Sequence, residues 1–187
     1  MLVLIFKINL EIAIIKAIWT DTWRGKRHIM KLKYLIDEDF INYSKPAMFI
    51  GFPKCSFKCD IESGQKICQN SHLATLPNIE ISKEKIVQRY IDNPITKAVV
   101  VVGLEPLDTF TELFDLIKTF REKTLDDIVI YTGYTETEKY DEVYLGLGHF
   151  SNIYVKFGRY IPNQESHYDK VLGVKLASDN QYGVKIS

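Results

Sequence analysis

The chain has 187 residues, which is enough for one domain built around one hydrophobic core. Hydrophobic residues make up 46% of it, a content that excludes an intrinsically disordered chain. The 24 basic and 24 acidic side chains cancel, so net charge provides no general attraction to nucleic acids or to anionic membranes. We therefore expect neither a nucleic acid nor a membrane among its partners.

Residues 1–29 begin with an apolar run that Lys7, Glu11 and Lys16 interrupt. The run is too short and too charged for a membrane span. Basic residues follow the apolar part, an order opposite to that of a signal peptide. Two interpretations stay open: an amphipathic extra helix lying on the domain, or translated upstream sequence with Met30 as the natural start. We prefer the second, because the sequence over 30–187 accounts for a complete domain by itself.

The first strand signal is Ala47–Phe52, a short apolar run followed by a cysteine-containing loop that extends to about Pro77. A helix is predicted over 83–92 with Ser82 as its N-cap. Its expected apolar stripe consists of Ile86, Val87, Tyr90 and Ile91. Lys97–Val102 is a continuous β-branched run, which is typical of a parallel strand buried on both faces.

The clearest helix signal follows Thr109, which is predicted to form a capping box with Glu112. The apolar residues after it fall at helical spacing and indicate a core-facing stripe: Phe110, Leu113, Phe114, Ile117 and Phe120. A weaker helix is predicted over Glu136–Leu145. The remaining strand predictions are Asp127–Thr132, Asn152–Lys156, Val171–Leu176 and Tyr182–Ile186.

Strands that alternate with helices predict βαβ units and a parallel sheet. The predicted fold class is α/β: a partial (β/α) barrel or an open, mainly parallel sheet, in a single domain. Ligands of such sheets collect at the carboxyl ends of the strands. The cysteine loop, the turn at Gly103–Pro106 and the turn at Tyr131–Tyr134 each follow a predicted strand, so we expect all three at one edge.

All cysteines of the chain, Cys55, Cys59 and Cys68, fall within fourteen residues. An odd, clustered set does not indicate a disulfide framework and favours a reducing, cytoplasmic setting. Three thiolate donors in one loop point to a metal site. Two kinds of site stay open. One is a closed Cys3His zinc site that includes His72, and the other is an iron–sulfur cluster with one iron lacking a protein ligand.

Four segments in order resemble radical S-adenosylmethionine (SAM) enzymes, and more narrowly the activating proteins of anaerobic ribonucleoside-triphosphate reductases. The family loop is Cys-x3-Cys-x2-Cys. Here it is Cys-x3-Cys-x8-Cys, with an apparent insertion at Asp60–Gln65. The turn G-L-E-P-L is similar to the family's G-G-E-P-L, with Leu104 in place of the second glycine. The third match is the segment Y-T-G-Y, and the fourth is a C-terminal stretch in two parts, Gly158–Ile161 and Leu176–Gln181.

This resemblance implies a radical SAM type of fold and a 4Fe-4S cluster bound by Cys55, Cys59 and Cys68. It implies SAM on the open iron, contacted by Gly103 and Glu105, with Ile67 near the adenine. No side chain is expected to act as a general acid or base.

The implied activity is reductive cleavage of SAM to a 5′-deoxyadenosyl radical, which installs a glycyl radical on an anaerobic ribonucleotide reductase or a similar partner. An electron donor such as flavodoxin or ferredoxin is expected. Two alternatives stay open: a radical SAM enzyme acting on another protein or a small molecule, and a non-catalytic Cys3His zinc-binding module.

Overall fold

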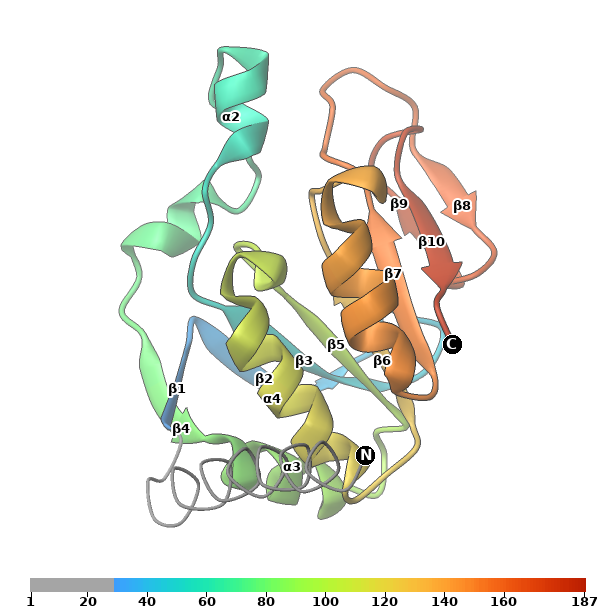
Figure 1. Ribbon diagram of the computed structural model, residues 1–187. Helices are drawn as coiled ribbons and strands as arrows, with labels where there is room; N and C mark the ends of the chain where they lie inside the picture. Colours follow the sequence, from blue (N-terminus) through green and yellow to red (C-terminus); the bar gives the residue numbers. More distant parts are fainter. Residues whose placement is uncertain (1–28) are drawn as a thin grey trace, which may run out of the picture.

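The computed structural model describes residues 29–187 and is built on a six-stranded sheet of order β10-β7-β6-β5-β3-β2 (Figure 1). The four central strands are parallel: β3 (Ala47–Phe52), β5 (Ala98–Gly103), β6 (Asp127–Tyr131) and β7 (Ile153–Phe157). Antiparallel strands close the two edges: β2 (Tyr34–Asp39) and β10 (Tyr182–Lys185). In the described part of the chain the sheet is open and mainly parallel, as one of the two predicted architectures requires.

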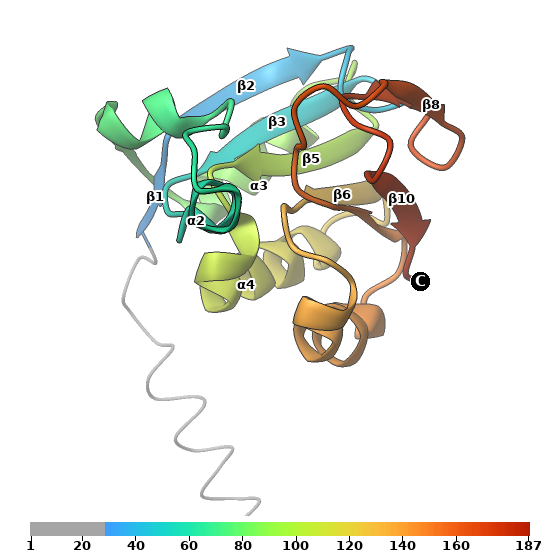
Figure 2. The ribbon, with the colours of Figure 1, turned by 90° about the horizontal axis from the view of Figure 1, so that it is seen from above.

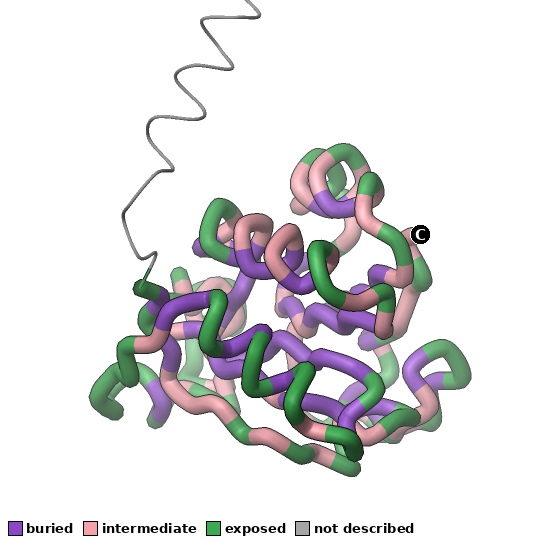
Figure 3. Tube along the Cα trace, turned by 90° about the horizontal axis from the view of Figure 1, so that it is seen from below, coloured by how far each residue is buried: buried purple, intermediate pink, exposed green. Residues whose placement is uncertain are grey.

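Helices cover one face of this sheet (Figures 1 and 2). They are α3 (Lys83–Ile91), α4 (Phe110–Arg121) and a helical segment after β6, made of 3₁₀ turns at Thr137–Lys139 and Leu147–His149 around a π-helix at Asp141–Gly146. The larger hydrophobic core lies between these helices and the sheet. Figure 3 shows this arrangement as buried residues along the central strands and exposed residues on the outer side of the helices.

The opposite face of the sheet carries a smaller core, completed by the hairpin of β8 (His167–Asp169) and β9 (Val174–Leu176). Side chains alternate between the two faces along each strand. In β7, Ile153, Val155 and Phe157 pack into the larger core, whereas Tyr154 packs against the smaller one. Lys156, two residues after Tyr154, therefore belongs to the same face as the smaller core.

Two short strands, β1 (Ile29–Leu32) and β4 (Ile79–Ser82), pair outside the main sheet. The sequence did not predict β1, β2, β4 or β8, because these strands are short or rich in charged residues. The predictions for the N-terminal extension lie outside the described residues, except at Ile29. This residue belongs to β1 and pairs with Ser82 of β4. Among residues 29–187, no helix combines the length and the apolar character needed to span a bilayer.

Four local predictions were wrong. The loop after β3 is not irregular throughout, because it contains α2 (Lys58–Ser63) and a 3₁₀ turn at Ser71–Thr75. Ile91 is 45% exposed and does not join the core. Thr109 makes no side-chain capping bond, since a 3₁₀ turn at Pro106–Thr109 leads directly into α4. The regular helix expected over Glu136–Leu145 is the 3₁₀ and π-helical segment described above.

Candidate functional site

A cavity of about 430 Å³ lies where the central parallel strands end. All three cysteines line it, together with Gly103, Glu105 and Gly133. The three turns that were predicted to share one edge of the sheet therefore meet there. This convergence follows from the parallel order, because the chain leaves β3, β5 and β6 in the same direction.

The cysteine loop starts directly after β3 and rises into α2, which projects beyond the rest of the domain (Figure 1). The predicted insertion at Asp60–Gln65 makes up most of this short helix and the turn after it. Phe57 and Gly64, on either side of the helix, both adopt left-handed backbone conformations, with φ of 53° and 66°. The chain thus turns sharply on each side of α2 and returns Cys68 to the cavity.

The thiols of the loop are half-buried and unpaired by disulfides. Burial raises the pKa of Cys55 to about 12, and it raises the pKa of Cys59 as well. Both are therefore protonated at neutral pH in the metal-free protein. A metal that binds here must displace these protons, so binding strengthens as the pH rises.

His72 does not complete a zinc site. Its side chain is exposed, and it is not among the residues that line the cavity. Within residues 29–187, no group of three or more His, Cys, Asp and Glu side chains is arranged to hold a single metal ion. A 4Fe-4S cluster requires a different arrangement of ligands, because each cysteine binds a separate iron. The three sulfurs therefore do not have to converge on one point.

Gly103 ends β5 in a conformation that requires glycine. Its φ is 108°, and a Cβ atom there would lie 2.4 Å from the backbone nitrogen of Phe52. The Gly103 carbonyl accepts a hydrogen bond from Asn70 Nδ2 at 3.2 Å. Asn70 follows Cys68 by two residues, so this bond attaches the end of the cysteine loop to the end of β5.

Glu105 is 5% exposed, and its carboxylate lies among donors from its own turn and from the turn after β6. It accepts hydrogen bonds from the Leu107 N–H (3.1 Å), the Thr132 hydroxyl (2.8 Å) and the Gly133 N–H (2.8 Å). Burial raises the pKa of Glu105 to about 7, although these three bonds favour the ionised form. Much of the carboxylate's bonding capacity thus holds the two turns together.

Lys156 is a residue that the sequence reasoning missed. It is 7% exposed and lines the cavity, and its Nζ donates to the Gly158 carbonyl at 2.7 Å. Burial lowers the pKa of Lys156 to about 8. The available signal was the alternation in β7, which places this lysine on the face opposite Val155 and Phe157.

Ile67, expected near a bound adenine, is half-buried and is not among the residues that line the cavity. Leu104, which stands where the radical SAM proteins that the sequence resembles have a second glycine, does line it. The cavity wall next to the G-L-E-P turn therefore has more side-chain bulk than a G-G-E-P turn would give it.

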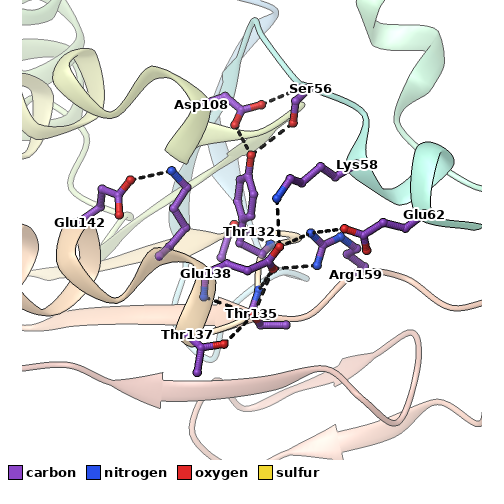
Figure 4. A network of polar contacts seen from close by, with 12 residues as sticks. Ser56, Lys58, Glu62, Asp108, Thr132, Thr135, Thr137, Glu138, Glu142 and Arg159 are labelled. Atoms are coloured by element: carbon purple, nitrogen blue, oxygen red, sulfur yellow. Dashed lines mark hydrogen bonds and ion pairs between the residues drawn. The ribbon is translucent and has the colours of Figure 1, made fainter.

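A polar network lies between α2 and the segments after β6 and β7 (Figure 4). Two of its members, Lys58 and Arg159, line a small pocket together with Cys55 and Cys59. Arg159 donates two hydrogen bonds to Glu138, at 2.8 and 2.7 Å, and pairs with Glu62 of α2 at 3.1 Å. Lys58 also pairs with Glu138, at 3.1 Å. The network attaches α2 to the ends of β6 and β7, and only the folded structure reveals it.

A family model described as a 4Fe-4S single cluster domain matches residues 47–179, which is more than two thirds of the chain. The chain belongs to this family. The matched range includes all three cysteines, both turns that Glu105 connects, and the hairpin of β8 and β9. Comparisons with curated proteins and with solved structures gave no match.

Membership of the 4Fe-4S single cluster domain family identifies the group that the thiols would hold. The donor set fits a 4Fe-4S cluster, because soft thiolates are its usual ligands and all three line one cavity. The chain has no fourth cysteine, so one of the four irons would lack a thiolate from this chain.

Proposed function

We propose that the protein holds a 4Fe-4S cluster through Cys55, Cys59 and Cys68 and uses it to cleave SAM reductively. The observation that carries the proposal is that one cavity is lined by all three cysteines and by the G-L-E-P turn. Three thiolates would leave one iron without a ligand from this chain, and the turn contributes polar groups to the same cavity. A cluster with a free iron and an adjoining cavity suits a chelating ligand.

The cavity matches the chemistry of an amino-acid moiety. Its volume of about 430 Å³ falls in the usual range for sites that bind small molecules. Among residues 29–187, the ammonium group of Lys156 donates one hydrogen bond, to the Gly158 carbonyl, which leaves donors for a ligand carboxylate. The carboxylate of Glu105, which lines the same cavity, complements a ligand amino group. The cavity also has apolar surface, contributed by Val102, Tyr131 and Leu176.

A reduced cluster held by the three cysteines would supply the single electron that cleavage of SAM into methionine and a 5′-deoxyadenosyl radical requires. The residues of this chain orient the ligand and limit the access of water. Gly103 lets the backbone pass close to β3, Glu105 holds the two turns at fixed separation, and Lys156 places a positive charge on the cavity wall. None of these steps requires a general acid or base.

For the radical acceptor we propose a glycine of an anaerobic ribonucleotide reductase or a similar glycyl radical enzyme, with flavodoxin or ferredoxin as electron donor in the cytoplasm. The support is the Y-T-G-Y segment, which resembles the reductase-activating proteins. In this chain Gly133 of that segment lies at the cluster loop, since a Cβ there would be 3.5 Å from Cys59 Sγ.

The first experiment is anaerobic reconstitution with iron and sulfide, followed by dithionite reduction and addition of SAM. We expect a brown protein with four irons per chain, a reduced-cluster EPR signal that changes with SAM, and 5′-deoxyadenosine and methionine as products. Each single Cys→Ala variant should lose both the signal and the products. A colourless wild-type protein that retains one tightly bound zinc would contradict the proposal.

A second experiment identifies the acceptor. The reconstituted protein, SAM and reductant are incubated with an anaerobic ribonucleotide reductase and, separately, with an unrelated glycyl radical enzyme. The expected result is a glycyl radical EPR doublet in the first mixture. SAM cleavage without a doublet in either mixture would retain the chemistry and reject this class of acceptor.

A further inference from the structure

We propose that Asp60 is a positioning residue that holds Cys68 next to Cys59 across the inserted segment. The proposal rests on the function above in one respect, which is that Cys68 serves as the third cluster ligand. The proposal concerns the segment inserted between Cys59 and Cys68, which is the largest departure of this loop from the Cys-x3-Cys-x2-Cys motif of radical SAM proteins.

The insertion allows Cys68 to lie far from Cys59. A two-residue spacing keeps two cysteines within about 10 Å of each other, whereas an eight-residue spacing allows a separation of up to about 30 Å. Ordering the longer segment also costs more conformational entropy. Something other than chain connectivity must therefore bring Cys68 to the cavity.

Asp60 provides that connection. Its Oδ1 atom accepts hydrogen bonds from two consecutive backbone groups, the N–H of Ile67 at 2.9 Å and the N–H of Cys68 at 2.8 Å. Asp60 is the residue directly after Cys59. One side chain thus joins the two ends of the inserted segment, at the cysteines themselves.

The rest of the insertion is held by other contacts. Ser63 Oγ lies 2.8 Å from the Gln65 carbonyl oxygen and 3.2 Å from that of Asp60, and its one hydroxyl proton can be donated to either. The Gly64 N–H donates to the Ile61 carbonyl and ends the helix. Glu62 pairs with Arg159 outside the loop. These contacts shape α2 and attach it to the domain, whereas the Asp60 carboxylate is what bonds to the Cys68 backbone.

The predicted consequence is local, because α2 contains no buried residue. Removal of the Asp60 carboxylate should leave the core intact and release Cys68 from Cys59. Asp60→Asn should behave like the wild type, since its amide oxygen accepts both N–H groups. Asp60→Ala and Asp60→Leu lack any acceptor, and Leu has nearly the shape of Asp.

The test uses the full chain without cluster, in a Cys55→Ser background that leaves only the two thiols of interest. A bifunctional reagent that fluoresces on joining two neighbouring thiols reports their proximity. We expect Asp60→Ala and Asp60→Leu to react about tenfold more slowly than the parent, and Asp60→Asn to react at the parental rate. Glu62→Ala, on the same helix, is the matched control and should also react at the parental rate.

Cluster loading provides the second measurement, in chains with all three cysteines. Asp60→Ala should bind fewer than four irons after reconstitution, with thermal unfolding close to that of the wild type, and Asp60→Asn should bind four. Equal cross-linking rates in all variants would overturn the role of Asp60 even if every variant bound a cluster. Suppose that the Asp60 variants cross-link more slowly than the parent, but the wild type binds no cluster. The positioning role of Asp60 would then stand, and the proposed function would be rejected.

Discussion

The carboxylate of Glu105 accepts a hydrogen bond from the backbone N–H of Gly133 at 2.8 Å. These residues lie in the turns after β5 and β6, each of which is only weakly diagnostic by itself. The same carboxylate accepts the Thr132 hydroxyl at 2.8 Å. The G-L-E-P and Y-T-G-Y segments therefore form one unit of the site, and a change in either should affect the other.

Replacement of Glu105 by Gln should remove a pH dependence from the stability of the cluster-free protein. Burial raises the pKa of Glu105 from 4.5 to about 7, so between these values the folded state keeps a proton that the unfolded state releases. Wild-type stability should fall over this range as the pH rises, by at most about 3 kcal/mol. Urea unfolding between pH 4.5 and 8 measures it.

Glu80→Gln is the matched control for that experiment, because Glu80 is an exposed glutamate in a surface ion pair with Lys31. The difference between wild type and Glu105→Gln should vary with pH, whereas the difference between wild type and Glu80→Gln should vary much less. A constant difference for Glu105→Gln would show that this carboxyl titrates alike in both states.

Lys156→Met should separate stability from ligand binding. Burial lowers the pKa of Lys156 from 10.5 to about 8, so above pH 8 the folded state has lost a proton that the unfolded state still holds. Wild-type stability should therefore rise between pH 8 and 10.5 relative to that of the variant. At pH 7 the variant should be at least as stable as the wild type, because a buried charge has been removed.

The same variant should bind SAM more weakly, by about tenfold to a hundredfold, because a charge-assisted hydrogen bond to the ligand carboxylate is lost. Equilibrium titration of reconstituted wild type and Lys156→Met with SAM measures the change. Equal affinities would exclude Lys156 from the ligand site.

Two glycine substitutions should differ sharply in how far they lower the free energy of unfolding. Gly103→Ala places a Cβ 2.4 Å from the Phe52 nitrogen at a φ of 108°, so unfolding free energy should fall by about 2–4 kcal/mol. At Gly133 a Cβ would lie 3.5 Å from Cys59 Sγ and 3.6 Å from Arg159 Cγ, which are ordinary contacts. Gly133→Ala should therefore cost less than about 1 kcal/mol. Urea unfolding of both variants, without cluster, tests the contrast.

The ion pair between Arg159 and Glu138 should contribute measurable stability. The side chains are 12% and 27% exposed, and the two bonds between them are parallel. A double-mutant cycle with Arg159→Gln and Glu138→Gln should give a coupling energy of about 1 kcal/mol. The pair of Lys31 and Glu80, 62% and 60% exposed, is the control and should give less than about 0.5 kcal/mol.

The stabilisation by the Arg159–Glu138 ion pair should depend on pH. Arg159 and Lys58 lower the pKa of Glu138 below its ordinary value of 4.5, so the folded state holds this carboxylate ionised where the unfolded state is protonated. The stabilisation is complete above pH 4.5 and is lost as the pH falls further. A coupling energy that did not decline between pH 5 and 3 would contradict the assignment.

The central strands were predictable because their signal is local. β3 and β5 are continuous apolar runs, β6 is apolar after Asp127, and β7 is apolar except for Lys156. Such runs are typical of parallel strands buried on both faces. The edge strand β2 was missed because three of its six residues are acidic, which a strand tolerates only at an edge of a sheet. Likewise, Ile91 satisfied the helical period but lies past the part of α3 that faces the core.

The sequence alone determined the inventory of donors and their order: three cysteines in one loop, and a turn after each of three parallel strands. Only the tertiary structure decided how these groups are used. It directs Glu105 to Thr132 and Gly133, buries Lys156 at the cavity, and makes Asp60 the link between Cys59 and Cys68. The physical reason is that periodicity reports which face a residue occupies, whereas a hydrogen-bond partner depends on which strand ends and loops meet in space.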